Sequence, residues 1–362
     1  YGISTKGIDK AKTENVSLII AMDCGIKATD KVSYAQSLGI DFIICDHHIP
    51  SDELPQAIAV LDPKQAACPY PFKDLCGCGI GFKLIHALTK ESGGGLEEIV
   101  PFLDLVAMAI AADVVPMVGE NRILTHFGIL QIQDNPRLGI RFFVNELKRK
   151  INVSDLVFVL APRINGAGRI KHGSHAVALL LSENKEEAMS RARAIELFNS
   201  ERKELDQKIT AQAMDQIKDN QEEELYSTVV FQPDWHKGVV GIVASRLIET
   251  HYRPTVVFAP SGDYYTGSVR SVKGLDVYHI LEACQEHIVQ FGGHRYAAGL
   301  TIKPEDYLAF KKAFELAVAQ NIRPEQRIPS MAYDLEMTLD KITPKFNRII
   351  AQMSPFGPGN MR

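Results

Sequence analysis

The sequence predicts an α/β protein in which a parallel-sheet domain is joined by a long helix to a second, smaller α/β domain. Near the start of the chain, short apolar runs that end in acidic residues alternate with helical stretches. A long, highly charged helical stretch spans 183–220, and a new set of strands and helices follows it. Strand–helix–strand order at this spacing is typical of parallel sheets with right-handed crossovers. The 362 residues, 46% hydrophobic and 23% charged, suit a globular chain of about two to three domains.

Three strands are predicted in the first domain. Val16–Asp23 is nearly all apolar and ends in a carboxylate, the pattern of a parallel strand buried on both faces. A helical segment at 30–38 precedes the second strand, Asp41–Cys45, and Ala57–Leu61 forms the third. Residues 79–150 are then mostly helical. We expect the first two strands to be neighbours in the sheet.

The charged stretch at 183–220 has little to bury on one side, so we interpret it as a connecting helix. After it, strands are predicted at Thr228–Gln232, Thr255–Ala259 and Tyr264–Val269, and helices at Gly241–Thr250 and Pro304–Ala319. The predicted parts are a first domain at 1–183, a connecting helix at 184–222, a second domain at 223–340 and the start of a linker at 341–362.

Composition narrows the class of protein. The formal net charge is −4, so nucleic-acid binding would need a local basic groove. The six cysteines are sparse and several lie in apolar runs, which predicts reduced thiols in a cytoplasmic protein. The spacing of Cys68, Cys76 and Cys78 does not suit a structural zinc site. No secretory signal opens the chain, and acidic residues interrupt the apolar stretch Pro101–Gly119, so we expect a buried helix and no membrane partner.

Acidic and histidine side chains follow the predicted strands. Asp23 ends the first strand, and Asp46, His47 and His48 follow the second. Ligands bind at the carboxyl ends of parallel strands, and mixed oxygen and nitrogen donors suit Mn²⁺ or another divalent first-row ion. Asp113 lies in an otherwise apolar helix end, where a lone carboxylate is costly unless paired or metal-bound. Taken alone, Asp23 is better explained as a cap and the histidines equally well as a polar turn; together they favour a metal site.

Several glycine-rich segments are suited to phosphate. Ala161–Arg169 (APRINGAGR) places arginines and an asparagine around small residues, and glycine lets a backbone approach a phosphate closely. Gly267–Ser271 and Phe291–His294 are similar, and Trp235–Gly238 precedes a helix whose N-terminus would favour an anion. Each alone predicts only a surface turn. Their number favours a phosphate-binding role.

These segments also carry a resemblance to a known family. DCG at Asp23–Gly25, DHH at Asp46–His48, the run around Asp113, APRINGAGR, WHKGVVGIVASRL, GSVRS and FGGHRYAAGL lie in one order over nearly the whole chain. In these motifs the chain resembles the DHH superfamily of phosphoesterases, and within it the RecJ-like single-stranded-DNA exonucleases. The resemblance implies a DHH domain followed by a DHH-associated C-terminal domain that binds nucleic acid.

The resemblance also implies a role for each matching residue. Asp23 would be a metal ligand shared by two ions, His47 and Asp113 would be further ligands, Asp46 would orient the site, and His48 would face the scissile phosphate. The residues implied to contact DNA are Arg163, Asn165, Arg169, His236, Ser268, Arg270, Gly292, Gly293 and His294.

The implied activity is two-metal hydrolysis of single-stranded DNA, 5′ to 3′, in repair and recombination, with Mn²⁺ as the ion and Mg²⁺ as the alternative. A single-strand-binding protein and a helicase are the implied protein partners. The family's first motif, DxDxDG, and the OB-fold domain expected after FGPGNMR are absent from this sequence. We therefore expect an internal piece of a longer protein that is inactive or weak alone.

Two other functions are compatible with these motifs. A DHH phosphodiesterase could act on short oligonucleotides or cyclic dinucleotides, although the long connecting helix suits a long strand better. The other function is that of a non-catalytic clamp on single-stranded DNA that derives from a DHH enzyme. Proteins of that lineage have lost metal ligands, whereas Asp23, His47 and Asp113 are present here.

Overall fold

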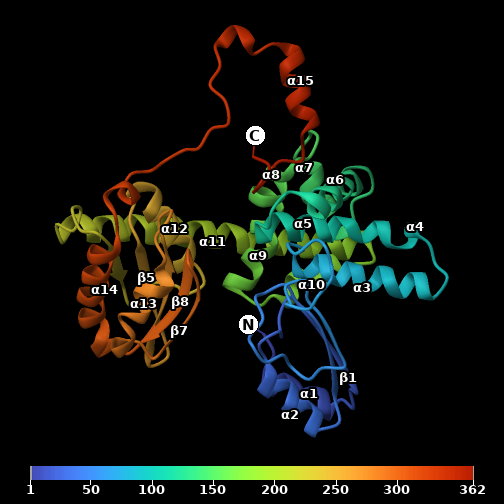
Figure 1. The fold of residues 1–362 in the computed structure, drawn as a ribbon, viewed down its shortest axis with the longest axis horizontal. Coiled ribbons are helices and arrows are strands. Elements are labelled where there is room, and N and C mark those ends of the chain that lie inside the picture. The colour runs from blue at the N-terminus through green and yellow to red at the C-terminus, as the bar shows by residue number, and fades with distance from the viewer. Residues whose placement is uncertain (1, 362) are drawn as a thin grey trace. The chain divides into compact units, whose positions relative to one another are not determined.

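The computed structural model describes residues 2–361 and divides into two compact units (Figure 1). Unit 1 contains Tyr1–Asn165, Ala176–Arg193 and Thr338–Arg362, and unit 2 contains Gly166–His175 and Ala194–Met337. Helix α9 (Ala161–Ile170) and the long helix α11 (Lys185–Asp219) each contribute residues to both units. The predicted α/β class, with a parallel sheet, a long helix and a second α/β unit, is confirmed.

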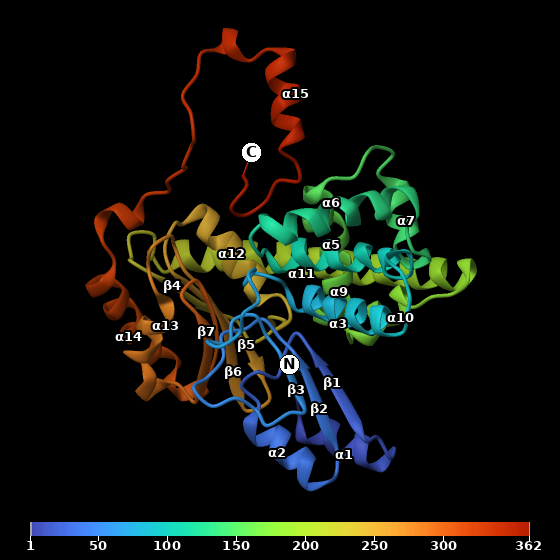
Figure 2. The same cartoon turned by 45° about the vertical axis from the view of Figure 1, so that its right-hand side comes forward.

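Unit 1 begins with helix α1 (Thr5–Thr13) and a three-stranded sheet. Strands β1 (Leu18–Met22), β2 (Asp41–Cys45) and β3 (Ala59–Leu61) lie side by side in that order and are all parallel (Figure 2). Helix α2 (Thr29–Ser37) crosses from β1 to β2, as a parallel pair requires.

Strand β1 is an edge strand, and the prediction that it is buried on both faces is wrong. Among residues 2–361 it pairs with β2 alone, and its side chains alternate: Leu18, Ile20 and Met22 are 40–48% exposed, whereas Ala21 is buried. An apolar run by itself cannot distinguish a central strand from an edge strand with one open face, because neighbours far along the sequence decide which faces are covered.

The rest of unit 1 is helical. Helix α5 (Leu103–Asp113) is apolar around most of its surface and lies between α3 (Gly77–Glu91) and α6 (Gly119–Asp134). At its buried start, Asp104 accepts two hydrogen bonds of 2.6 Å from the Arg137 guanidinium. Further helices are α4 (Leu96–Ile99), α7 (Leu138–Glu146), α8 (Val153–Asp155), a π-helical turn (Leu156–Leu160), α10 (Ser174–Leu180) and α15 (Pro344–Gln352).

Unit 2 is a five-stranded sheet between helices. The strands β4 (Thr228–Phe231), β5 (Thr255–Ser261), β6 (Tyr264–Arg270), β8 (Ala297–Ile302) and β7 (Gln290–His294) lie in this order, with β4 and β5 parallel and the others antiparallel. Helix α12 (Val240–Thr250) packs on β5 and β6 from one face.

Short 3₁₀ turns occur in both units. They span Val100–Phe102, Gln285–His287, Pro304–Asp306, Pro324–Arg327 and Leu339–Lys341.

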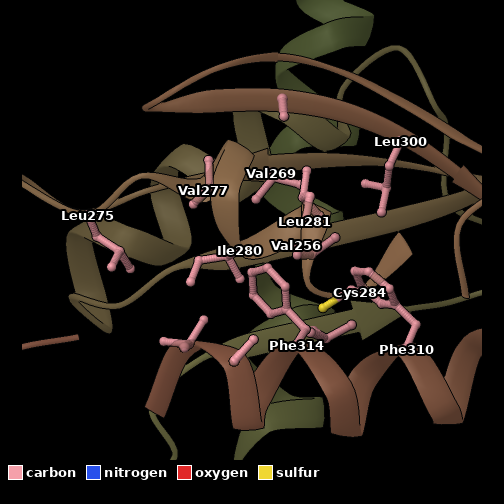
Figure 3. Close-up of a cluster of buried hydrophobic side chains, with 14 of the residues drawn as sticks. Val256, Val269, Leu275, Val277, Ile280, Leu281, Cys284, Leu300, Phe310 and Phe314 are labelled. Carbon is pink, nitrogen blue, oxygen red and sulfur yellow. The ribbon is translucent and has the colours of Figure 1, made fainter. Parts of the chain in front are cut away.

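The other face of this sheet carries the main core of unit 2. Val256, Val269 and Leu300 of the sheet pack against helices α13 (Val277–Glu282) and α14 (Tyr307–Asn321), whose Phe310 and Phe314 fill the centre (Figure 3). These side chains are almost fully buried, and burial of an aromatic side chain of this size contributes about 1.5–3 kcal/mol. The sheet that presents Ser268 and Arg270 therefore rests on a rigid support.

Three segments predicted as turns are regular structure. Ala161–Arg169 lies in helix α9, Gly267–Arg270 lies in strand β6, and Phe291–His294 lies in strand β7, which pairs with β8. Glycine-rich composition favours turns locally, but tertiary packing overrides it here: Ala167 is fully buried, and Gly293 lies so close to the backbone of Ala297 and Ala298 that any side chain would collide with it.

The six cysteines are free thiols, and Cys45, Cys76 and Cys284 are buried. Among residues 2–361, no helix combines the length and the apolar character needed to cross a bilayer.

Candidate metal centre and nucleic-acid face

The carboxyl ends of β1 and β2 bring Asp23 and Asp46 together. Met22 and Cys45 are register partners, so the residue after each strand lies at the same edge of the sheet. Backbone hydrogen bonds continue the ladder one step further: the Asp23 N–H donates to the Cys45 carbonyl and the Asp46 N–H to the Leu61 carbonyl. The two acids are thus fixed by sheet pairing.

Asp23 has an unusual backbone conformation, with φ at +61°, and lies against the first turn of helix α3. A Cβ on Gly77, the first residue of α3, would lie 2.6 Å from the Asp23 Cβ and 2.7 Å from its Cα. Only glycine fits there. Within residues 2–361 no side chain caps the start of α3, and the Asp23 side chain lies beside its first residue.

His47 lies between two carboxylates. Its Nε2 is 3.1 Å from Asp23 Oδ1 and 3.4 Å from Asp113 Oδ2, and its side chain is 9% exposed. Asp113 is the last residue of α5, whose end brings this acid, distant in sequence, to the sheet edge. The His47 Nδ1 is buried and has no hydrogen-bond partner among residues 2–361.

Asp46 and His48 lie beside this cluster. The Asp46 carboxylate is 1% exposed and accepts hydrogen bonds from the backbone N–H groups of Ile26 (3.0 Å) and His47 (2.8 Å). Its Oδ1 is also 2.7 Å from the His48 Nδ1. The His48 ring is half exposed and has its Nε2 free to face solvent or substrate.

Electrostatics within the cluster match this geometry. The hydrogen bond from His47 to Asp23 raises the pKa of the imidazole although burial opposes it. Burial raises the pKa of Asp113, and nearby Asp23 adds to this effect. For Asp46, burial favours the neutral acid, but the hydrogen bonds from Ile26, His48 and His47 outweigh it and lower the pKa.

The donor set fits a divalent cation. Asp23, His47 and His48 offer ligand atoms that all lie within 4.8 Å of one another, and the Asp113 carboxylate faces the same His47 nitrogen. Two carboxylates with imidazole nitrogen suit Mn²⁺ and related ions. Repulsion between Asp23 and Asp113, which raises the pKa of Asp113, would be relieved by a cation between them.

Sequence reasoning missed two nearby features. Asp62 follows β3 at the same sheet edge; it is buried, its Oδ2 has no hydrogen-bond partner among residues 2–361, and burial raises its pKa. Its position after the third strand was the available signal. The second feature is a cavity of about 490 Å³ lined by Asp23, Asp113, the predicted DNA-contacting Asn165 and mostly apolar side chains such as Phe82 and Phe102.

We expect Mn²⁺ affinity to rise with pH from about pH 6 and to level off above the raised pKa of His47, because the imidazole must lose its proton before Nε2 can bind an ion. Without metal, the stability of the fold depends on pH in the opposite direction to the Mn²⁺ affinity. The charged imidazole stabilises the fold fully below its unfolded pKa of about 6.5, and this contribution is lost as pH rises through the raised value. Manganese EPR across this range measures the affinity. His47→Asn should weaken binding and flatten the pH profile, and a flat profile in the unsubstituted chain would contradict the assignment.

The predicted DNA-contacting residues of unit 2 meet at the start of helix α12. The Arg169 Nη1 donates to the Gly238 carbonyl at 3.3 Å, and the Gly238 N–H donates to the His236 Nδ1 at 3.1 Å. The α9 backbone at Arg169 approaches Gly238 so closely that a side chain at 238 would collide with it. Arg169 and His236 therefore lie together.

Ser268 and Arg270 lie beside the same helix start. The Arg270 Nη1 donates to the Ser268 Oγ at 2.8 Å, and a Cβ on Gly241 would lie 3.0 Å from both side chains. Burial lowers the pKa of Arg270, and the like charge of Arg169 lowers it further. Two guanidinium groups close together at a helix N-terminus are chemically suited to an anion.

Strand register extends this surface to Gly292 and His294. Ser268 pairs with Gly299, which pairs with Gly292, while Arg270 pairs with Ala297, which pairs with His294. Residues paired across strands share a face, so Ser268, Arg270, Gly292 and His294 lie on one side of the sheet. Gly292 and Gly299 are exposed and bear no side chains, which leaves an open strip beside the arginine.

Three further charged residues of unit 2, on helices α11 and α12, form a cluster that was not predicted. Asp206 on α11 is fully buried and accepts two hydrogen bonds, of 2.8 and 2.9 Å, from the Arg246 Nε on α12, and Arg202 is 4.0 Å from it.

The predicted DNA-contacting residue Arg163, in contrast, belongs to unit 1. Its guanidinium lies over the Phe143 ring and donates to the Val159 carbonyl.

Comparison with known proteins identifies both domains. The family model for the DHH family, N-terminal domain, matches residues 3–110, and the model for the DHHA1 domain matches 221–320. The single-stranded-DNA-specific exonuclease RecJ of Bacillus subtilis (strain 168) is 36% identical over 362 residues, 99% of this chain and 45% of that relative. Residues 3–110 are a DHH domain and residues 221–320 a DHHA1 domain.

Other RecJ proteins also match this chain. The RecJ of Salmonella typhimurium is 35% identical over 99% of this chain and 66% of the relative. The chain thus spans about half to two thirds of the curated relatives that it matches. Among solved structures, the RecJ of Thermus thermophilus in complex with Mn²⁺ has a TM-score of 0.89 at 27% identity, and the match covers 99% of this chain and 53% of that one. An exonuclease RecJ bound to manganese has a TM-score of 0.77 at 28% identity, with coverage of 91% and 82%.

Proposed function

We propose that this DHH chain is the catalytic part of a metal-dependent exonuclease that hydrolyses single-stranded DNA from 5′ to 3′ in repair and recombination. The observation that carries the proposal is the convergence of Asp23 and Asp113 on the His47 Nε2 at the carboxyl edge of the DHH sheet. The names of the relatives, which are single-stranded-DNA-specific exonucleases, supply the substrate. We keep the predicted division at 1–183, 184–222, 223–340 and 341–362 as part of the proposal.

Asp23, His47 and Asp113 would hold two divalent ions, with Asp23 shared between them. Mn²⁺ is the proposed ion and Mg²⁺ the alternative, because RecJ structures are known in complex with each. Such ions supply charge stabilisation at the attacking and leaving oxygens and make water a better nucleophile. The chain's own contribution is to hold three ligands on rigid elements: two strand ends and one helix end.

Asp46 and His48 would act beside the ions. Asp46 is fully hydrogen-bonded and buried, so it orients the His47 backbone and the His48 ring instead of contacting solvent. By accepting from Nδ1, Asp46 fixes the His48 tautomer that leaves Nε2 as the atom facing the scissile phosphate. His48 can then donate a hydrogen bond to a phosphate oxygen only when its ring is protonated.

The proposed DNA face combines arginines with an open glycine strip. Arg169 and Arg270 bind phosphates, with His236, Ser268, Gly292 and His294 beside them, and Arg163 and Asn165 contact the strand in unit 1. Gly293 can contribute only its backbone, because it pairs with Ala298 and so points to the other face of the sheet. A net charge of −4 requires that affinity come from such a local cluster. We further propose a cytoplasmic location, where free thiols remain reduced, and a single-strand-binding protein and a helicase as partners that supply the strand.

Arg270→Ala and Arg169→Ala should each weaken single-strand binding by roughly tenfold at low salt, equally for all sequences, because phosphates carry no base information. Each should also reduce the salt slope of log Kd by about one, as one phosphate contact is lost. Fluorescence anisotropy with oligonucleotides of different sequence measures both. The matched control is Lys303→Ala, which removes the same charge. Lys303 follows the end of β8, whereas Ala297, which pairs with Arg270, is at the start of that strand. Unchanged affinity in both arginine variants would place the DNA elsewhere.

The proposed activity is tested in the full-length protein on a 5′-phosphorylated single strand, a dinucleotide and a cyclic dinucleotide, with increasing Mn²⁺. Stepwise release of mononucleotides from the long strand supports the proposal. Cleavage of the short substrates alone would show an oligonucleotide phosphodiesterase, and strand binding without hydrolysis at any Mn²⁺ concentration would show a clamp.

A further inference from the structure

The segment 353–360, which we call the C-terminal loop, packs on the residues that follow Asp113 in sequence. The Met117 N–H donates to the Pro358 carbonyl at 2.6 Å. A Cβ on Gly357 would lie 2.9 Å from the Met117 Cβ, and one on Gly359 would lie 3.3 Å from a Val118 methyl. The loop thus packs closely on residues 116–118, although it lies about 240 residues further along the chain.

The C-terminal loop is itself rigid. The Asn360 Nδ2 donates to the carbonyls of Met353 (3.0 Å) and Pro355 (2.9 Å), and Gly357 and Asn360 exchange backbone hydrogen bonds. Arg122, in the first turn of α6, donates to the carbonyls of Met353 and Ser354, both at 3.1 Å. These bonds fix the loop to α6 as well as to Met117, so it can support a neighbouring strained segment.

Such a segment is present. Val114 directly follows Asp113 and has φ +58° and ψ +30°, a left-handed conformation that is a true outlier for a β-branched residue. Strain of this kind persists only where the surrounding structure holds it in place. The Val114 side chain is 61% exposed, so its own packing supplies little of that support. The turn at Val114 also sets where the helix stops and thus where the Asp113 carboxylate points.

We propose that the C-terminal loop is a positioning element of the metal centre: by binding Met117 and Val118 it holds the strained turn at Val114, which directs Asp113 at His47. This inference rests on the proposed role of Asp113 as a metal ligand. Loss of the loop's hold would let Val114 relax to an ordinary conformation and move the carboxylate from the ligand set. The loop lies outside the two ranges matched by the family models, 3–110 and 221–320.

The test uses the full 362-residue chain. Asn360→Ala removes the loop's internal hydrogen bonds, and Gly357→Ala pushes the loop from Met117. Each should weaken Mn²⁺ binding by about tenfold, as substitutions beyond the ligands themselves commonly do. Manganese EPR measures the affinity, and circular dichroism and metal-free DNA binding, which should not change, measure the fold. The matched control is Gln352→Ala, because Gln352 is exposed and alanine keeps its backbone.

A rescue distinguishes positioning from general destabilisation. Val114→Asn introduces a residue that adopts the left-handed conformation readily, so in the Asn360→Ala background it should restore Mn²⁺ affinity to within about twofold of the unsubstituted chain. If either loop variant unfolds, the other carries the comparison. Asp113→Asn is measured in parallel.

Four results are informative. Weaker binding with rescue supports the proposal. Unchanged Mn²⁺ affinity in a folded loop variant, while Asp113→Asn weakens it, would overturn the loop's role and leave the metal site intact. Weakening that Val114→Asn does not restore would also overturn it. Unchanged affinity in Asp113→Asn would overturn both the metal assignment and the inference.

Discussion

Asp23→Ala in the full-length protein is expected to reduce hydrolysis of single-stranded DNA by roughly 10³-fold or more and to abolish tight Mn²⁺ binding. As the proposed ligand of both ions, Asp23 contributes to every step that depends on them, and the several kcal/mol that a metal supplies correspond to this factor in rate. The fold should survive, because the Asp23 side chain is 62% exposed and alanine leaves the sheet hydrogen bonds in place. Activity on a 5′-phosphorylated strand and manganese EPR measure the two effects.

The control for this substitution is Asp41→Ala. Asp41 is an exposed acid at the opposite end of the adjacent strand β2, so the change in charge is the same and the distance from the ligand set is large. Asp41→Ala should leave both measurements within about twofold. Substantial manganese-dependent hydrolysis in Asp23→Ala would show that Asp23 is not a shared ligand.

Gly77→Ala should weaken Mn²⁺ binding by about 10- to 100-fold, an effect of the size seen when a group that orients a metal ligand is lost. The added methyl group would lie 2.6 Å from the Asp23 Cβ, much closer than two carbons can approach, so either α3 or Asp23 must move. We expect Asp23 to move more than α3, because its backbone already has an unusual conformation and its side chain is exposed. Manganese EPR is again the measurement.

Gly79→Ala is a matched control two residues further along the same helix. Its new Cβ would meet Leu75 and Cys76 at 3.5 Å or more, an ordinary contact distance, and alanine raises helix propensity by up to about 1 kcal/mol. We expect unchanged Mn²⁺ affinity and equal or higher thermal stability. Equal Mn²⁺ affinity in Gly77→Ala and Gly79→Ala would show that the contact between α3 and Asp23 does not set the site.

Local patterns were sufficient for the parts of the fold that follow from neighbouring residues. The predicted strand Asp41–Cys45 and the helices at 30–38 and 241–250 agree with β2, α2 and α12 to within one residue at each end. The position of Asp23 and Asp46 after adjacent parallel strands could also be predicted, because the ends of parallel strands meet at one edge. The functional role of these acids remains a proposal.

Long-range contacts account for what the patterns did not predict. Glycine-rich composition pointed to a turn at Phe291–His294, yet pairing with β8 makes it a strand and aligns Gly292 with Ser268 through Gly299. The apolar run of β1 gave no sign that one face would be open. Arg163 and Arg169 lie in one motif, but helix α9 directs the first to Phe143 and the second to Gly238.

The sequence by itself determined the positions of strands β1 to β6, the parallel first sheet and the identity of the acids and histidines at its edge, because hydrophobic periodicity and strand ends are local properties. Only the tertiary structure decided that Asp113 meets His47, that Gly77 must be glycine to admit Asp23, and that residues 353–360 support the turn after Asp113. Each of these depends on close packing between segments far apart in sequence, and no local pattern encodes which distant surfaces will meet.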